Sequence, residues 1–203
     1  MKKSRAGKAF SDELAGWLRG KQPRTLASLE AVFGDRTFAI IFLLLMILPA
    51  TPLPTGGITH VFEVIVLLLC LELIAGFQAP WLPKRWKHMH LGKTFTGKVV
   101  PVILKWIRRC EKASSPRGRW IFHLPLAQRL LGLLIFCLTL AALLSPPFSG
   151  LDTLPSLGVV LISLAIILED VVLLLAGTMV GAAGVGLTIA LGTAIVQTGR
   201  HFF

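Results

Sequence analysis

The sequence predicts an all-α integral membrane protein. We expect a helical bundle of two repeated, proline-broken helical hairpins, together with a C-terminal transmembrane helix and amphipathic surface helices. The first reason is composition, because 54% of the 203 residues are hydrophobic and 15% are charged, whereas soluble domains have about 45–50% apolar and about 25% charged residues. The second is a pattern that occurs twice, in which an apolar run is broken by closely spaced prolines and a second apolar run then ends on a glutamate.

The third reason is the distribution of the net charge of +11. Eight of the 21 Lys and Arg residues lie between Lys2 and Arg36, and eleven lie between Lys84 and Arg119, whereas the turn Ala50–Gly57 carries no charge. By the positive-inside rule both basic segments face the cytoplasm and the turn faces out. We therefore expect contact with anionic lipids. Nucleic-acid binding is not expected, because aromatic residues are not interleaved with the basic ones as a stacking surface requires.

The N-terminal segment, residues 1–37, is predicted to be cytoplasmic and interfacial. Ser11 can cap a first short amphipathic helix and Thr25 a second one, which ends at Gly34. These helices either lie along the lipid headgroups or pack against the membrane domain itself. The sequence alone favours neither arrangement.

The first membrane hairpin is predicted at residues 38–80. Its first apolar run, Phe38–Leu48, has eleven residues, whereas a helix that crosses a bilayer needs about 20. A second run, Ile58–Leu71, ends at Glu72. The turn between the runs contains Pro49, Pro52, Pro54, Gly56 and Gly57. Irregular backbone at membrane depth occurs only beside protein or a water-filled cavity, and paired broken segments are typical of transporter binding sites.

Residues 81–125 are predicted to form a basic, tryptophan-containing cytoplasmic linker. The composition of this segment suits a membrane interface, and we do not expect a soluble catalytic domain here. Its tryptophans are Trp81, Trp86, Trp106 and Trp120.

The second hairpin and the C-terminal helix are predicted at residues 126–203. The runs Leu130–Leu144 and Leu157–Leu168 are separated by prolines that include Pro146 and Pro147, and Glu169 ends the second run. The uncharged stretch Val171–Gln197 is long enough to span the bilayer with tilt.

Two further features of this region bear on packing and topology. Gly177 and Gly181 suit close helix packing, either within the chain or in a dimer. Two crossings before the linker and three after it give parallel repeats, whereas re-entrant segments would allow an inverted arrangement.

The comparable depth of an arginine and a glutamate in each hairpin predicts ion pairs. Arg36 and Glu72 lie at comparable distances from the first turn, as do Arg129 and Glu169 from the second. We expect Arg36 to pair with Glu72, and Arg129 to pair with Glu169, near the cytoplasmic boundary. Asp170 adjoins the second pair. These ion pairs either hold the two helices of each hairpin together or take part in ion or substrate coupling.

His60 and Glu63 are three residues apart and therefore share one face of a helix just beyond the first turn. They either line a cavity, where histidine can relay protons, or lie exposed at the outer interface. The expected ion or substrate pathway comprises His60, Glu63, Pro49, Pro52, Pro54, Gly56, Gly57, Pro146, Pro147 and Asp152.

The sequence contains no pattern typical of a metal site, a cofactor site or an enzyme. The three cysteines, Cys70, Cys110 and Cys137, indicate neither a disulfide framework nor a zinc site. A glycine-rich phosphate loop and a nucleophile elbow are also missing from the sequence. We therefore expect no cofactor, no metal and no catalytic residue.

Several short motifs, in their order and spacing from about residue 26 to about residue 192, are similar to those of a known family. They are Gly34-Asp35-Arg36, the cluster Pro49, Pro52 and Pro54, Trp81-Leu82-Pro83, Arg129, Pro146-Pro147 and the acidic pair Glu169-Asp170. The chain resembles the ExoD family of bacterial exopolysaccharide-synthesis membrane proteins. One departure is that Val171 and Val172 follow Asp170 where the family usually has a glycine.

The resemblance implies a multi-pass bacterial inner-membrane protein that supports exopolysaccharide production and alkaline tolerance, without an established enzymatic step. The leading hypothesis is a small transporter-like or channel-like module. Alternatives are a non-transporting scaffold for polysaccharide-synthesis proteins and, ranked last, a membrane enzyme that acts on a lipid-linked sugar. Because the two halves are small, we also expect a homo-oligomer, with a dimer as the simplest case.

Overall fold

The computed structural model describes residues 10–20, 32–51, 58–77, 79–81, 100–113, 118–146 and 149–202, and within this part of the chain all regular structure is helical. The elements are α1 (Phe10–Arg19), the 3-10 helix η1 (Gly34–Arg36), α3 (Thr37–Met46), α4 (Ile58–Ala75), α6 (Val100–Ala113), α7 (Arg119–Phe122), α8 (Pro125–Leu144), α9 (Thr153–Leu168) and α10 (Val171–Phe202). The predicted all-α fold is confirmed for these residues.

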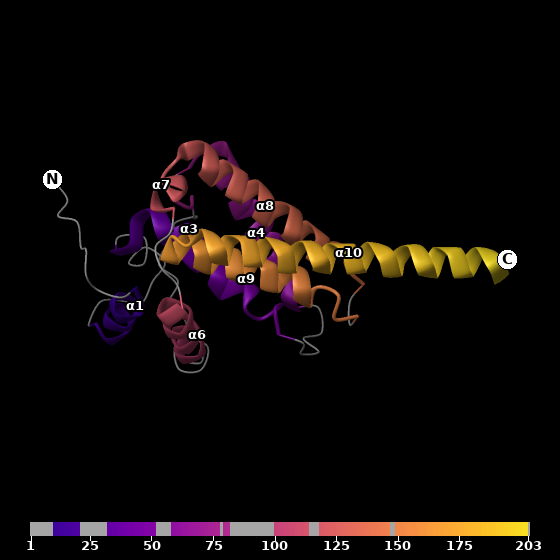
Figure 1. Ribbon diagram of the computed structural model, residues 1–203, viewed down its shortest axis with the longest axis horizontal. Coiled ribbons are helices and arrows are strands. Elements are labelled where there is room, and N and C mark those ends of the chain that lie inside the picture. The colour runs from indigo at the N-terminus through magenta and orange to yellow at the C-terminus, as the bar shows by residue number, and fades with distance from the viewer. Residues whose placement is uncertain are drawn as a thin grey trace.

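Each helix of the first predicted hairpin packs mainly against a helix of the second. Helix α3 packs mainly against α9, and α4 packs mainly against α8, whereas α10 lies along α9 and extends beyond the bundle toward the C-terminus (Figure 1). Most side chains of α3 and α9 are buried, so these two short helices form the centre of the bundle. Each hairpin therefore makes its main contacts with the other hairpin.

The first apolar run ends where its prolines begin. Helix α3 ends at Met46, and a turn follows in which the amide of Ala50 donates to the carbonyl of Met46. Pro49 is buried in this turn. The remaining turn residues of the predicted pathway, Pro52, Pro54, Gly56, Gly57 and Pro147, lie outside the described residues.

Glycines bring α9 and α10 into close contact. A methyl group added at Gly158 would lie 2.6 Å from the Cα atom of Gly181, and one added at Gly177 would lie 2.9 Å from the backbone of Ile162. The Gly177 and Gly181 step is thus used for packing within the chain, as one of the two predicted alternatives has it. Gly186, one and a half turns further on, has no such neighbour within 4 Å.

Three helices expose continuous apolar stripes. On α4 the stripe contains Val61, Val64, Leu68 and Leu71, and on α8 it contains Leu126, Leu130, Leu133, Leu140 and Leu144. On α10 it contains Val172, Leu175 and Met179. Residues Pro125–Leu144 and Val171–Leu191 are long and apolar enough to cross a membrane. Exposed apolar surface of this extent is rare on soluble monomers and indicates contact with lipid or another apolar surface.

The amphipathic helices α1 and α6 pack against each other at one end of the molecule (Figure 1). The prediction that Ser11 caps the first helix is wrong, because Ser11 lies inside α1, where its amide and hydroxyl donate to the Glu111 carboxylate at 2.9 and 2.6 Å. A charged partner on α6 binds this hydroxyl more strongly than the backbone does. The helix expected after Thr25 lies in a stretch that the structure does not describe, apart from its last residues.

Candidate functional site

The candidate site is formed where α9 ends and α10 begins. Glu169 has a left-handed backbone conformation (φ 55°, ψ 39°) that terminates α9. The Asp170 carboxylate then accepts the amide of Val172 at 2.9 Å and caps α10, an arrangement that satisfies a free donor of the first helical turn. The chain therefore reverses direction within two residues, and the Glu169 side chain is held at the end of the bundle.

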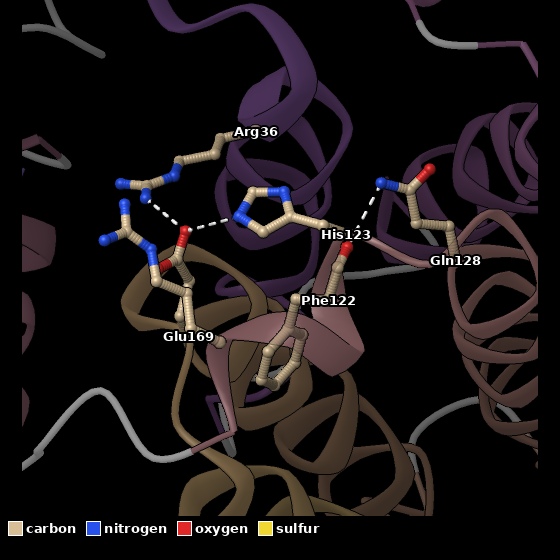
Figure 2. A network of polar contacts seen from close by, with 6 residues as sticks. Arg36, Phe122, His123, Gln128 and Glu169 are labelled. Carbon is tan, nitrogen blue, oxygen red and sulfur yellow. Dashed lines mark hydrogen bonds and ion pairs between the residues drawn. The ribbon is translucent and has the colours of Figure 1, made fainter. Parts of the chain in front are cut away.

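Three cationic or titratable side chains surround the Glu169 carboxylate. Arg36 lies 2.7 Å from Oε1, Arg119 lies 2.7 Å from Oε2, and His123 Nε2 lies 3.4 Å from Oε1. The Glu169 side chain is only 7% exposed, whereas those of Arg119 and His123 are more than half exposed. We call these four residues the Glu169 cluster; Figure 2 shows Arg36 and His123 approaching Glu169 from different elements.

The short helix α7 brings Arg119 and His123 to this cluster. Gly118, with φ 84°, starts α7, and a side chain at this position would clash with Val171. At its other end the buried Phe122 anchors the helix, and its carbonyl accepts the Gln128 side-chain amide at 3.2 Å (Figure 2). The sequence interpretation missed both α7 residues because it treated them as linker. Their only signal in the sequence was the pair Arg117 and Arg119 shortly before Pro125.

The predicted ion pairs within each hairpin are wrong. Arg36 pairs with Glu169 of the second hairpin, and the ion pairs of the described residues include neither Arg36 with Glu72 nor Arg129 with Glu169. The four residues do lie at the same end of the bundle, as their depth predicted. The partner changes because α3 packs against α9, which places Arg36 next to Glu169.

The two remaining members of those predicted pairs have other environments. The half-buried Glu72 accepts the backbone amide of Trp81 at 2.9 Å. Arg129 lies over Gly76, where an added methyl group would be 2.9 Å from its Nη2 atom. Gly76 has φ 96° and thus ends α4 in a conformation that also leaves room for the guanidinium.

A cavity of about 390 Å³ opens at this end of the bundle. It is lined by the starts of α3 and α8 and by the ends of α4 and α9, and its polar lining includes Arg36, His123, Gln128, Arg129 and Glu169. Helices α3 and α8 therefore both run away from the cavity, and α4 and α9 both run toward it. Its volume falls within the range of small-molecule sites, about 300–1,000 Å³.

A second polar group lies near the opposite end of α4. Glu63 is completely buried, and its Oε2 atom lies 2.8 Å from Nδ1 of His60, whose side chain is 30% exposed. The other oxygen, Oε1, has no hydrogen-bond partner among the described residues. Asp152, at the start of α9, acts electrostatically on Glu63. The burial of Glu63 differs from the exposed position at the outer interface that was one of the two alternatives, while the cavity of the other alternative stays a prediction.

The other predicted pathway residues that the structure describes are less enclosed. Pro146 is exposed, and Asp152 is half-buried. Within the described residues no group of three His, Cys, Asp or Glu side chains is arranged to hold a metal ion. The described cysteines form no disulfide.

Comparison with known proteins identifies relatives along nearly the whole chain. The family described as "Exopolysaccharide synthesis, ExoD" matches residues 10–190. An uncharacterized protein of Synechocystis sp., slr1875, is 25% identical over 88% of this chain and 80% of its own length. Protein ExoD of Rhizobium meliloti is 27% identical over 97% of this chain and 84% of its own length. No solved structure matches the chain.

Proposed function

We propose that this chain, which belongs to the ExoD family, is a multi-pass bacterial inner-membrane protein that supports exopolysaccharide synthesis or export as a small transporter-like or channel-like module. The apolar stripes on α4, α8 and α10 support residence in the bilayer, since lipid is the surface that such stripes fit. In this proposal the basic N-terminal segment and linker face the cytoplasm and contact anionic lipids.

The observation that carries the proposal is the burial of Glu63. A carboxylate inside an apolar helix is costly in a membrane, and residues of this kind usually mark ion or proton pathways. Glu63 is 0% exposed, one of its oxygens has no partner among the described residues, and its one ion-pair neighbour, His60, reaches the surface. A packing role alone would not require an ionisable side chain here. We propose that His60 and Glu63 exchange a proton or another small cation with the outside.

The direction of the helices supports a parallel repeat. The starts of α3 and α8 line the same cavity, as do the ends of α4 and α9. In the proposed topology the two hairpins are related by an axis along the membrane normal, as in transporters with parallel repeats. The five helices α3, α4, α8, α9 and α10 then make five crossings, in which the short helices α3 and α9 cross together with their flanking residues.

A scaffold for polysaccharide-synthesis proteins is the second candidate, and the exposed Trp81 and Trp120 of the basic linker favour it. Under either proposal we expect no catalysis. The glutamates at this end of the bundle do not share one environment, because Glu72 binds a backbone amide while Glu169 is held by arginines. A role in alkaline tolerance and assembly as a homodimer also belong to the proposal.

The test is complementation of a deletion strain with the variant Glu63→Gln. We expect at least a fivefold loss of exopolysaccharide, measured as secreted hexose, with an unchanged amount of protein in the membrane. The matched control is Glu72→Gln, the same chemical change on the same helix, which should retain most of the activity. In proteoliposomes with an internal pH dye, the unaltered protein should dissipate a proton gradient faster than Glu63→Gln.

The scaffold and the transporter-like module give different results. Full complementation by Glu63→Gln, together with proton leakage equal to that of empty liposomes, would contradict the transport proposal. That result would favour the scaffold.

A further inference from the structure

We propose that the cavity beside the Glu169 cluster binds a phosphate group through Arg129 and Arg36. The cavity is lined by these two arginines and by one carboxylate, Glu169. Arg119, which does not line the cavity, binds the second oxygen of the same carboxylate. Among the described side chains, two guanidinium groups thus contact the one glutamate, and the third, that of Arg129, also lines the cavity, so positive charge remains available to an anion.

Arg129 is the residue that an anion would engage first. It makes no hydrogen bond or ion pair with the described residues, so its donors have no acceptor in this part of the chain. Its guanidinium nevertheless has a defined place, over Gly76 at the end of α4. A guanidinium without a protein acceptor that faces a cavity is suited to bind two oxygens of an oxyanion at once.

Arg36 is the second ligand. Its Nη2 atom is bound to Glu169 at 2.7 Å, which fixes the side chain and leaves other N–H groups of the guanidinium for a second acceptor. Gln128, on the same helix as Arg129, also lines the cavity, although its amide nitrogen is used by Phe122. Arg36, at the end of η1 directly before α3, and Arg129, on α8, both line the cavity, so an anion between them would join the two hairpins.

The chemistry favours phosphate over a carboxylate. A phosphate monoester carries about 1.5–2 negative charges at pH 7 and three strong acceptor oxygens, and pyrophosphate carries more charge still, which suits two arginines that approach from different helices. Asp170 does not oppose such a ligand from the lining, because its carboxylate caps α10 outside the cavity. The phosphate has two possible sources, a membrane lipid headgroup and a soluble phosphate compound. The inference rests on the proposed function only in placing this end of the bundle at a membrane surface.

The experiment measures binding to the full chain in phosphatidylcholine nanodiscs. One arm titrates inorganic pyrophosphate, and the other adds phosphatidic acid to the nanodisc and counts bound lipid by native mass spectrometry. We expect Arg129→Ala to weaken binding at least tenfold and Arg129→Lys to weaken it less, because lysine keeps the charge but loses the planar fork. Arg129→Ala removes no described ion pair, so its unfolding temperature should stay within a few degrees of the unaltered protein.

The matched control is Arg109→Ala, which removes the same charge from an exposed position on α6 and should change binding less than twofold. Pyrophosphate binding would identify a soluble phosphate, and binding of phosphatidic acid alone would identify a lipid headgroup; either supports the inference. Equal affinity of Arg129→Ala and Arg109→Ala, or no saturable binding in both arms, would overturn it. Glu63 lies near the other end of α4, so Glu63→Gln should leave phosphate binding unchanged. Failure of this inference is therefore separable from failure of the transport proposal.

Discussion

Arg36 and Glu169 are 133 residues apart in the sequence, and their side chains meet at 2.7 Å. This contact joins the start of α3 to the end of α9 and thereby fastens one hairpin to the other. Glu169 is also the one described non-glycine residue with a positive φ angle, so the same position carries both backbone strain and the ion pair. The backbone conformation of Glu169 and its ion pair with Arg36 together hold the two halves of the chain in contact.

Removal of the Glu169 charge should destabilise the protein. Glu169→Gln leaves Arg36 and Arg119 close together without the negative charge and with one acceptor oxygen in place of two, and we expect the free energy of unfolding to fall by about 2–3 kcal/mol, somewhat less than for a fully buried pair because both arginines are partly exposed. Thermal unfolding in detergent measures the change. As a control, Glu72→Gln, which can still accept the Trp81 amide, should cost less than about 1 kcal/mol. Equal unfolding temperatures for the two variants would show that the cluster does not contribute to stability.

The contact between Gly158 and Gly181 should not tolerate a side chain. Gly158→Ala places a methyl group 2.6 Å from the Cα atom of Gly181 and should cost about 1–3 kcal/mol, because α9 and α10 have to move apart. Gly186→Ala is the matched control on α10. No atom lies within 4 Å of its added methyl group, so the substitution should stabilise the helix by about 0.5–1 kcal/mol. Both changes are read as shifts in unfolding temperature, and opposite signs are expected.

A charge placed on the exposed stripe of α8 should oppose insertion into the membrane. Leu133 lies near the middle of this helix and is 48% exposed, so Leu133→Lys should disfavour insertion by about 3 kcal/mol. Leu126→Lys, in the first turn of α8, should have little effect, because a lysine near the boundary extends toward water. Membrane fractionation of the two variants measures the difference. Equal recovery of both in the membrane fraction would argue against a lipid-facing stripe.

Labelling of Cys110 should depend on pH in an unusual way. Burial raises the pKa of the Cys110 thiol on α6, so less of the reactive thiolate is present at neutral pH than for an ordinary cysteine of pKa about 8.5. In the double variant Cys70→Ala and Cys137→Ala, the maleimide reaction at pH 7.5 should be slow. Its rate should rise about tenfold per pH unit and continue to rise above pH 8.5. Lys105→Cys, exposed on the same helix and placed in a background without other cysteines, should level off earlier.

Most of the helices follow from local sequence patterns, whereas the contacts between the helices do not. The apolar runs and prolines predicted α3, α4, α8, α9 and α10 because each pattern acts within its own segment. Depth along a helix is also a local property, so Arg36, Arg129 and Glu169 are found at one and the same end of the bundle. The neighbour of each helix depends on side-chain fit at contacts such as Gly158 with Gly181, which the spacing of charges does not encode.

The candidate site was predictable only in part for the same reason. His60 and Glu63 meet because residues three apart share a helix face. Arg119 and His123 belong to a segment with no apolar periodicity. They are far from Glu169 in the sequence and come close to it only in the folded bundle.

The crosswise packing of the two hairpins also sets the order in which the protein can be completed during synthesis. Helix α3 leaves the ribosome long before α9 exists, so the surface of α3 that faces α9 has no native partner while more than a hundred further residues are made. The first hairpin therefore lacks a main packing partner until α9 has been made, and the ion pair between Arg36 and Glu169 can form only then. A chain that ends between the two halves would leave uncovered the face of α3 that α9 covers in the full chain.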